Sequence, residues 1–127
     1  MLDLDEHDRS LLVRLEDFLT KHYALKRHHV AAVIKGSGGK EYFALHIDIQ
    51  GFDVCAEPIA LHNTLLGGEQ VELVMTVIMT NDGPQVVNPC GNCRQMLLQY
   101  CPQASVVIHT EKGLKKSTAV ELLPNPY

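Results

Sequence analysis

Two stretches decide the fold of this chain: Cys55-Ala56-Glu57, and Asn88-Pro89-Cys90-Gly91-Asn92-Cys93-Arg94-Gln95. A structural zinc takes four protein ligands in a closed tetrahedron, whereas a catalytic zinc keeps three and leaves the fourth position to water. Cys55, Cys90 and Cys93 therefore predict one catalytic zinc per chain. Glu57 lies two residues after the first cysteine, close enough to move the protons of a zinc-bound water without being a ligand itself.

Two other interpretations of these cysteines stay open. They could be small buried hydrophobic residues, or they could belong to a closed structural zinc site whose fourth ligand is Cys101 or a histidine. Cys101 follows Cys93 by eight residues, which is about 12 Å along a helix at roughly 1.5 Å per residue. We therefore expect Cys101 in the core, and we expect neither His62 nor His109 to be a ligand.

Composition narrows the class of protein. A chain of 127 residues is long enough for a single domain, residues 1–127, with a core that needs no disulfides. Its beginning is acidic and lacks the apolar segment of a signal peptide, and its apolar runs are too short to span a bilayer. We expect a cytoplasmic protein without a membrane partner. A net charge of -4 and a pI near 5.9 argue against long nucleic acid as a substrate.

Hydrophobic periodicity predicts alternating helices and strands. Leucines at three- and four-residue spacing favour a first amphipathic helix, and runs rich in valine and isoleucine favour strands. Thr118 and Glu121 form a possible capping box for a last helical turn. The predicted helices are 5–23, 55–66 and 88–100, and the predicted strands are 29–35, 41–47, 72–80, 105–109 and 114–116. This alternation indicates an α/β domain with a mixed sheet covered by helices on both faces.

Both cysteine stretches fall at predicted helix starts, with Asn88 as an N-cap and Pro89 at the first helical position. Zinc with three thiolates and a hydroxide carries a formal charge of about -2, and the N–H groups of helix amino termini stabilise thiolates. We expect Arg94 to offset more of this charge by hydrogen-bonding to a cysteine sulfur or to the neighbouring loop. The alternative is that Arg94 is an exposed helix residue.

The two stretches together resemble the cytidine deaminase superfamily, in the branch with three cysteine ligands that includes nucleoside cytidine deaminases and blasticidin-S deaminase. A glycine-rich turn at 36–39 and the closing Glu121-Leu122-Leu123-Pro124 extend the resemblance to roughly residues 28–127. It implies a three-layer αβα sandwich with a five-stranded mixed sheet, and a homotetramer whose neighbouring chains complete each pocket. It also implies that backbone groups at Ala56 and Asn88 hold the edge of the base.

The resemblance also suggests substrate contacts at the sugar end. His46-Ile47-Asp48 falls where nucleoside cytidine deaminases carry Asn-x-Glu, a pair that holds ribose hydroxyls. We expect His46 and Asp48 to face the substrate. The alternative is that both residues point outward at the end of a strand. Pro58 follows the glutamate where many members have arginine, and blasticidin-S deaminase-like members lack that arginine too. Tyr127 is a candidate aromatic lid over the pocket.

These features predict a zinc-dependent hydrolytic deaminase of a small free aminopyrimidine nucleoside. Glu57 is the expected proton shuttle. Cytidine or deoxycytidine is the leading substrate, and a modified cytosine nucleoside such as blasticidin S is the alternative. A catalytically silent zinc-binding module is a second alternative, although a purely structural site has no need of the carboxylate at Glu57.

Overall fold

The computed structural model describes residues 1–25, 27–50 and 52–126. Its centre is a mixed sheet with the strand order β2-β1-β5-β7-β8, to which β6 adds by pairing with β5. Strands β5 and β7 are parallel, and the other neighbours are antiparallel. The helices are α1 (Glu6–His22), α2 (Ala56–Leu66), α3 (Gly91–Tyr100) and α4 (Ala119–Leu122). The strands are β1 (Val30–Gly36), β2 (Glu41–Leu45), β3 (Ile47–Ile49), β4 (Phe52–Val54), β5 (Val71–Thr80), β6 (Gly83–Val86), β7 (Ser105–Thr110) and β8 (Gly113–Thr118).

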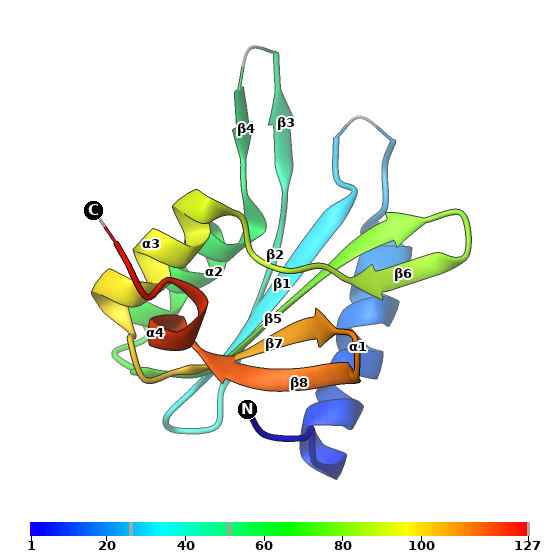
Figure 1. Ribbon diagram of the computed structural model, residues 1–127. Helices are drawn as coiled ribbons and strands as arrows, with labels where there is room; N and C mark the ends of the chain where they lie inside the picture. Colours follow the sequence, from blue (N-terminus) through cyan, green and yellow to red (C-terminus); the bar gives the residue numbers. More distant parts are fainter. Residues whose placement is uncertain (26, 51, 127) are drawn as a thin grey trace.

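Helices cover both faces of the sheet (Figure 1). Helix α1 packs on one face, against β1 and β5, while α2, α3 and α4 contribute to a second core on the other face. Strand β5 lies between the two layers and has five successive buried residues, 73–77. The predicted three-layer αβα sandwich with a mixed sheet is confirmed, but the sheet has six strands where five were predicted, because β6 adds to it. Cys55 and Cys90 lie directly before the first residues of α2 and α3.

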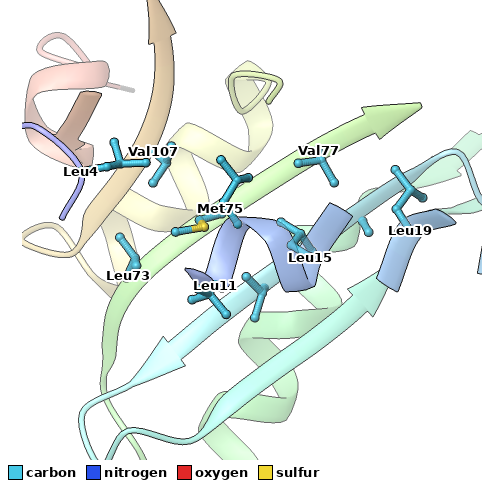
Figure 2. Packing of buried hydrophobic residues seen from close by; sticks show 11 residues of the cluster. Leu4, Leu11, Leu15, Leu19, Leu73, Met75, Val77 and Val107 are labelled. Atoms are coloured by element: carbon cyan, nitrogen blue, oxygen red, sulfur yellow. The ribbon is translucent and has the colours of Figure 1, made fainter. Parts of the chain in front are cut away.

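Helix α1 forms because its sequence provides hydrogen bonds to the N–H groups at its amino terminus and an apolar face that packs on the sheet. The side chain of Asp5 accepts from the N–H of Asp8, and the side chain of Asp8 accepts from the N–H of Asp5, which completes a capping box. Leucines at helical spacing then fill the core beside Met75 and Val77 of β5 (Figure 2). Leu15 lies at the centre of this cluster and is fully buried.

Replacing Leu15 with alanine should lower the free energy of unfolding by about 2–5 kcal/mol, because it removes buried contacts and leaves a cavity in a close-packed layer. Val13 on the same helix is 54% exposed, so Val13→Ala should change the free energy of unfolding by no more than about 0.5 kcal/mol. Urea unfolding followed by circular dichroism measures both. Equal effects of the two substitutions would contradict the packing of α1.

Two hairpins depart from the predicted elements. The predicted strand 72–80 is followed by a turn at Gly83 and by a strand that was not predicted, β6, which pairs with the end of β5. Gly83 has a φ of +97°, a conformation that glycine adopts without steric cost. The predicted strand 41–47 ends at Leu45, and β3 and β4 then form a separate two-stranded sheet. Of the helices in the described ranges, none combines the length and the apolar character needed to cross a membrane.

Candidate active site

The three cysteines of the two predicted motifs meet at the amino ends of α2 and α3. Cys55 is the N-cap of α2, Cys90 is the N-cap of α3, and Cys93 lies in the first turn of α3. Their Sγ atoms all lie within 4.8 Å of one another. A tetrahedral zinc with Zn–S bonds of about 2.3 Å separates its sulfurs by roughly 3.8 Å. The donor set and its spacing therefore fit one zinc ion with a fourth position left for water.

The start of α3 differs from the prediction by two residues. The helix begins after Cys90, so Asn88 is not its N-cap and Pro89 is not its first residue. The Cys90 sulfur takes over the capping role, accepting from the N–H of Cys93 at 3.5 Å. The side chain of Asn88 instead accepts from the N–H of His109 at 2.7 Å and donates to its carbonyl at 3.3 Å. These two bonds attach the loop before Cys90 to β7.

The thiols differ in acidity. Burial raises the pKa of Cys55 and of Cys93 above the usual range of a thiol. At Cys90 burial acts in the same direction, but the hydrogen bond from the Cys93 N–H and the neighbouring thiols outweigh it and lower the pKa. A coordinating zinc deprotonates a thiol outright. Helix amino termini around the cluster favour that thiolate form.

Glu57 lies beside this cluster as the second residue of α2 and is only 4% exposed. Burial raises the pKa of its carboxyl, although hydrogen bonds to its own backbone, Thr76 and Cys93 act in the opposite direction. A carboxyl that holds its proton more firmly than usual is suited to general acid and base chemistry near neutral pH. The sequence motif predicted that Glu57 lies near the metal, and the structure shows in addition that its carboxyl is buried.

A cavity of about 140 Å³ lies against the cluster. Among the predicted site residues, His46, Ala56, Glu57 and Asn88 line it together with Cys55 and Cys90, but Asp48 does not. Further lining residues, not singled out from the sequence, are Val30, Thr76, Ile78 and Val87. Thr76 was detectable in principle, because alternation along β5 turns it away from the face that Met75 and Val77 present to α1.

His46 is buried at the wall of this cavity, with its side chain 6% exposed. Its backbone N–H donates to the carbonyl of Val30 at 2.8 Å, and its ring meets that of His29 edge-on at 4.3 Å between centroids. Its Nε2 lies 3.6 Å from Oδ2 of Asp53. The carboxylate nearest to His46 is therefore one that the sequence pattern did not single out, and the predicted contact of Asp48 with sugar hydroxyls stays a prediction.

Arg94 braces the loop that carries Cys90. Its Nε donates to the carbonyl of Pro89 at 2.8 Å and its Nη1 donates to the carbonyl of Leu122 at 3.2 Å. Of the two contacts expected for Arg94, the structure shows the one to the loop. Within the described ranges its guanidinium makes no hydrogen bond to a cysteine sulfur. Its guanidinium charge remains close to the first turn of α3, so electrostatic support of the metal stays a prediction.

The remaining candidates lie away from the cluster. Cys101 is the C-cap of α3, at the end of the helix opposite to the cluster, and is buried in the core, where burial raises its pKa to about 11. This confirms its assignment to the core. His62 and His109 are exposed, and within the described ranges the group of possible metal ligands consists of Cys55, Cys90 and Cys93 alone. Tyr127, the predicted lid, lies outside the described residues.

An αβα sandwich that holds three thiols and a buried glutamate around a small cavity defines a zinc hydrolase. The chain belongs to the family described as the cytidine and deoxycytidylate deaminase zinc-binding region, which it matches over residues 5–110.

Individual relatives agree with this membership. The chain is 29% identical over 133 aligned positions to blasticidin-S deaminase from Bacillus cereus, covering 98% of this chain and 95% of that protein. It is 28% identical to cytidine deaminase from Sporosarcina psychrophila, covering 77% and 74% respectively. Its structure matches that of cytidine deaminase from Burkholderia pseudomallei with a TM-score of 0.73 at 25% identity, over 98% of this chain and all of the other.

Family, fold and site together establish the type of reaction. The chain is a zinc-dependent nucleoside deaminase, a hydrolase that cleaves a C–N bond. Zinc is its cofactor, and the three-cysteine cluster fits that ion. Because the chain is a deaminase, the alternative of a catalytically silent zinc-binding module does not hold. The specific nucleoside is a separate question.

Proposed function

We propose that this protein deaminates a small free cytosine nucleoside, with cytidine or deoxycytidine as the leading substrate. The observation that carries this proposal is the buried carboxyl of Glu57 beside three clustered thiols at one small cavity. The products are uridine or deoxyuridine and ammonia. We also propose that residues 1–127 act as one catalytic domain in the cytoplasm, where a reducing environment suits four free cysteines.

Each residue at the cavity has a distinct task in this proposal. Cys55, Cys90 and Cys93 would hold a zinc ion, which would supply a water made acidic enough to act as a nucleophile near neutral pH. Glu57 accepts the proton of that water and passes it to the ring nitrogen. A second proton, from the hydroxyl that is now bonded to the ring carbon, goes through Glu57 to the amino group as the C–N bond breaks, so that one water is consumed and one ammonia is released. The backbone at Ala56 and Asn88 holds the base edge.

A modified cytosine nucleoside of the blasticidin S type is the second candidate. Two observations favour it: the Bacillus cereus blasticidin-S deaminase aligns over nearly the whole of both chains, and Pro58 stands where many cytidine deaminases have arginine. Ammonia release from cytidine, deoxycytidine, cytosine and blasticidin S separates the candidates. A kcat/KM that is highest for cytidine or deoxycytidine supports the first candidate, and one that is highest for blasticidin S supports the second.

Light scattering should show a homotetramer. The cavity of about 140 Å³ in one chain is smaller than the roughly 300–1000 Å³ of typical small-molecule sites, so residues from neighbouring chains are needed to enclose a nucleoside. Exposed apolar side chains such as Leu66 and Tyr100, which are 74% and 63% exposed, provide surface for such contacts. A mass of 14.1 kDa at micromolar concentration would contradict this proposal.

His46→Ala should reduce kcat/KM for cytidine roughly tenfold more than for free cytosine. The physical reason is that His46 lines the cavity where the sugar end is expected, and losing one partner of a buried polar contact costs about 1–3 kcal/mol. His62→Ala, at an exposed position on α2, is the matched control and should leave both rates unchanged. Equal losses for nucleoside and base in His46→Ala would mean that other residues bind the sugar.

A further inference from the structure

Thr76 is the polar residue in the buried run of β5, and the proposed reaction gives it no task. Residues 73–77 of this strand are all buried, and the other four are a leucine, a methionine and two valines. Thr76 itself is 4% exposed. A buried hydroxyl without a hydrogen bond destabilises a fold, and a valine would fill nearly the same space without that cost. The hydroxyl of Thr76 therefore needs a partner.

Alternation along β5 decides which layer of the molecule Thr76 faces. Met75 and Val77 point toward α1 (Figure 2), so Thr76 points toward the opposite layer. Val74 lies two residues earlier on the same face of the strand and packs in the second core with residues of α2. The register partner of Thr76 on β1 is Ala32, whose side chain offers no polar atom. A partner for the hydroxyl has to come from the layer of α2.

That partner is the carboxyl of Glu57 in the first turn of α2. The hydroxyl of Thr76 is hydrogen-bonded to this carboxyl, and both residues line the same cavity. The backbone of Thr76 is held independently, because its carbonyl accepts from the N–H of Val87 at 3.0 Å. The strand therefore presents the hydroxyl to Glu57 from a fixed position.

The carboxyl of Glu57 depends on such a donor. Several rotatable bonds separate it from the backbone, and a group that transfers protons has to be held in one direction. Its other hydrogen bonds are to its own backbone and to Cys93. A coordinating zinc deprotonates the thiol of Cys93, which then has no proton to donate to a carboxylate. Among the described residues, Thr76 is then the side-chain donor that remains.

We infer that Thr76 is a positioning residue for the proton transfer: its hydroxyl donates to the carboxylate of Glu57 and fixes the direction in which that group accepts and returns protons. A hydroxyl can donate to a carboxylate and accept from a carboxylic acid, so the two side chains can stay bonded throughout the transfer. No proton of the reaction passes through Thr76. The inference rests on the proposed role of Glu57 and adds the group that orients it.

Thr76→Val removes the hydroxyl and keeps the branched shape of the side chain. With zinc-loaded protein and the nucleoside that it turns over fastest, kcat should fall about 10- to 100-fold, the effect expected when a charged group loses a hydrogen bond. KM should stay within about threefold of the parent value, because the substrate loses no contact. Thr76→Ser keeps the hydroxyl and should retain kcat to within about threefold.

Thr64→Val is the matched control. Thr64 is fully buried on α2, its Oγ1 donates to the carbonyl of Ala60 at 2.8 Å, and it does not line the cavity. Losing that hydroxyl should leave kcat and KM unchanged. If Thr76→Val does not fold, Thr76→Ser and Thr76→Ala, which differ only in the hydroxyl, provide the same comparison. A raised KM at unchanged kcat, or equal kcat for the serine and alanine variants, would overturn the inference.

A double-variant cycle separates a positioning role from a general structural one. If Thr76 acts through the carboxylate of Glu57, Thr76→Val should slow the Glu57→Gln protein by less than about twofold, although it slows the parent about 10- to 100-fold. Equal losses in the two backgrounds would mean that the hydroxyl acts independently of Glu57, and the inference would be wrong.

Crystal structures of the zinc-loaded parent and of Thr76→Val keep this inference separate from the proposed function. If no nucleoside releases ammonia, the proposed function has failed, and the direction of the Glu57 carboxyl in the two structures still tests Thr76. A carboxyl that leaves its parental position in Thr76→Val, with unchanged zinc content, supports the inference, and an unmoved carboxyl overturns it. An undiminished kcat in Thr76→Val, in a protein that Glu57→Gln inactivates, overturns the inference alone.

Discussion

Glu57→Gln should keep its zinc and its fold but deaminate cytosine nucleosides roughly 10²–10⁴-fold more slowly, the range typical for removal of a general acid or base. Glutamine has nearly the shape of glutamate, so the start of α2 and the cavity wall stay in place. The amide cannot accept and return a proton. The loss should therefore appear in kcat, while zinc content by metal analysis and the thermal transition remain close to those of the parent.

Glu111→Gln is the matched control for this substitution. Glu111 is exposed in the turn between β7 and β8, so the same change of charge there should leave the turnover rate unaffected. If Glu57→Gln turns over within about tenfold of the parent, a different group moves the protons, and the buried carboxyl has only a structural role.

Cys90→Ala should abolish both zinc binding and activity. Cys90 is exposed, whereas Cys93 is 2% exposed, so removing the Cys90 thiol disturbs the core least while it still leaves only two thiols for the metal. The free energy of zinc binding, which stabilises the folded state, is lost with the ion. The midpoint temperature of thermal unfolding should therefore fall as well. Metal analysis of the purified protein, followed by a thermal scan, measures these effects.

Cys101→Ala separates loss of a ligand from loss of any buried cysteine. Cys101 packs in the core under α3 and is absent from the cluster of three thiols. Its alanine variant should bind one zinc per chain and stay active, with a small loss of stability from the missing contacts. Full zinc occupancy in Cys90→Ala, or loss of zinc in Cys101→Ala, would contradict the ligand assignment.

Most of the fold could be predicted from the sequence because its signals are local. The leucine spacing of α1, the valine-rich run of β5 and the capping box of Thr118 and Glu121 each determine an element without help from distant residues. Strand β6 could not be predicted in this way, because its four residues GPQV carry no alternating pattern. It forms because a glycine at φ +97° returns the chain to the free edge of β5.

The catalytic centre was predictable for a different reason. Cys55, Glu57, Cys90 and Cys93 occur in two compact motifs, so their proximity follows from the resemblance and from the helix starts that carry them. The position of Asn88 could not be predicted from its preference for N-cap positions, because its side chain forms two hydrogen bonds with the backbone of His109 in β7 instead. Asp53 carried no sequence signal, and only the pairing of β3 with β4 places it beside His46.

Zinc-dependent deamination is tested by ammonia release from cytidine, deoxycytidine and blasticidin S, measured with one protein sample in three states: as zinc-loaded protein, after removal of zinc by a chelator, and after zinc is returned. We expect turnover of at least one of these nucleosides in the first state, its loss in the second and its recovery in the third. Zinc-loaded, folded protein that releases no ammonia from any of the three nucleosides, or release that persists at full rate without zinc, would contradict zinc-dependent deamination.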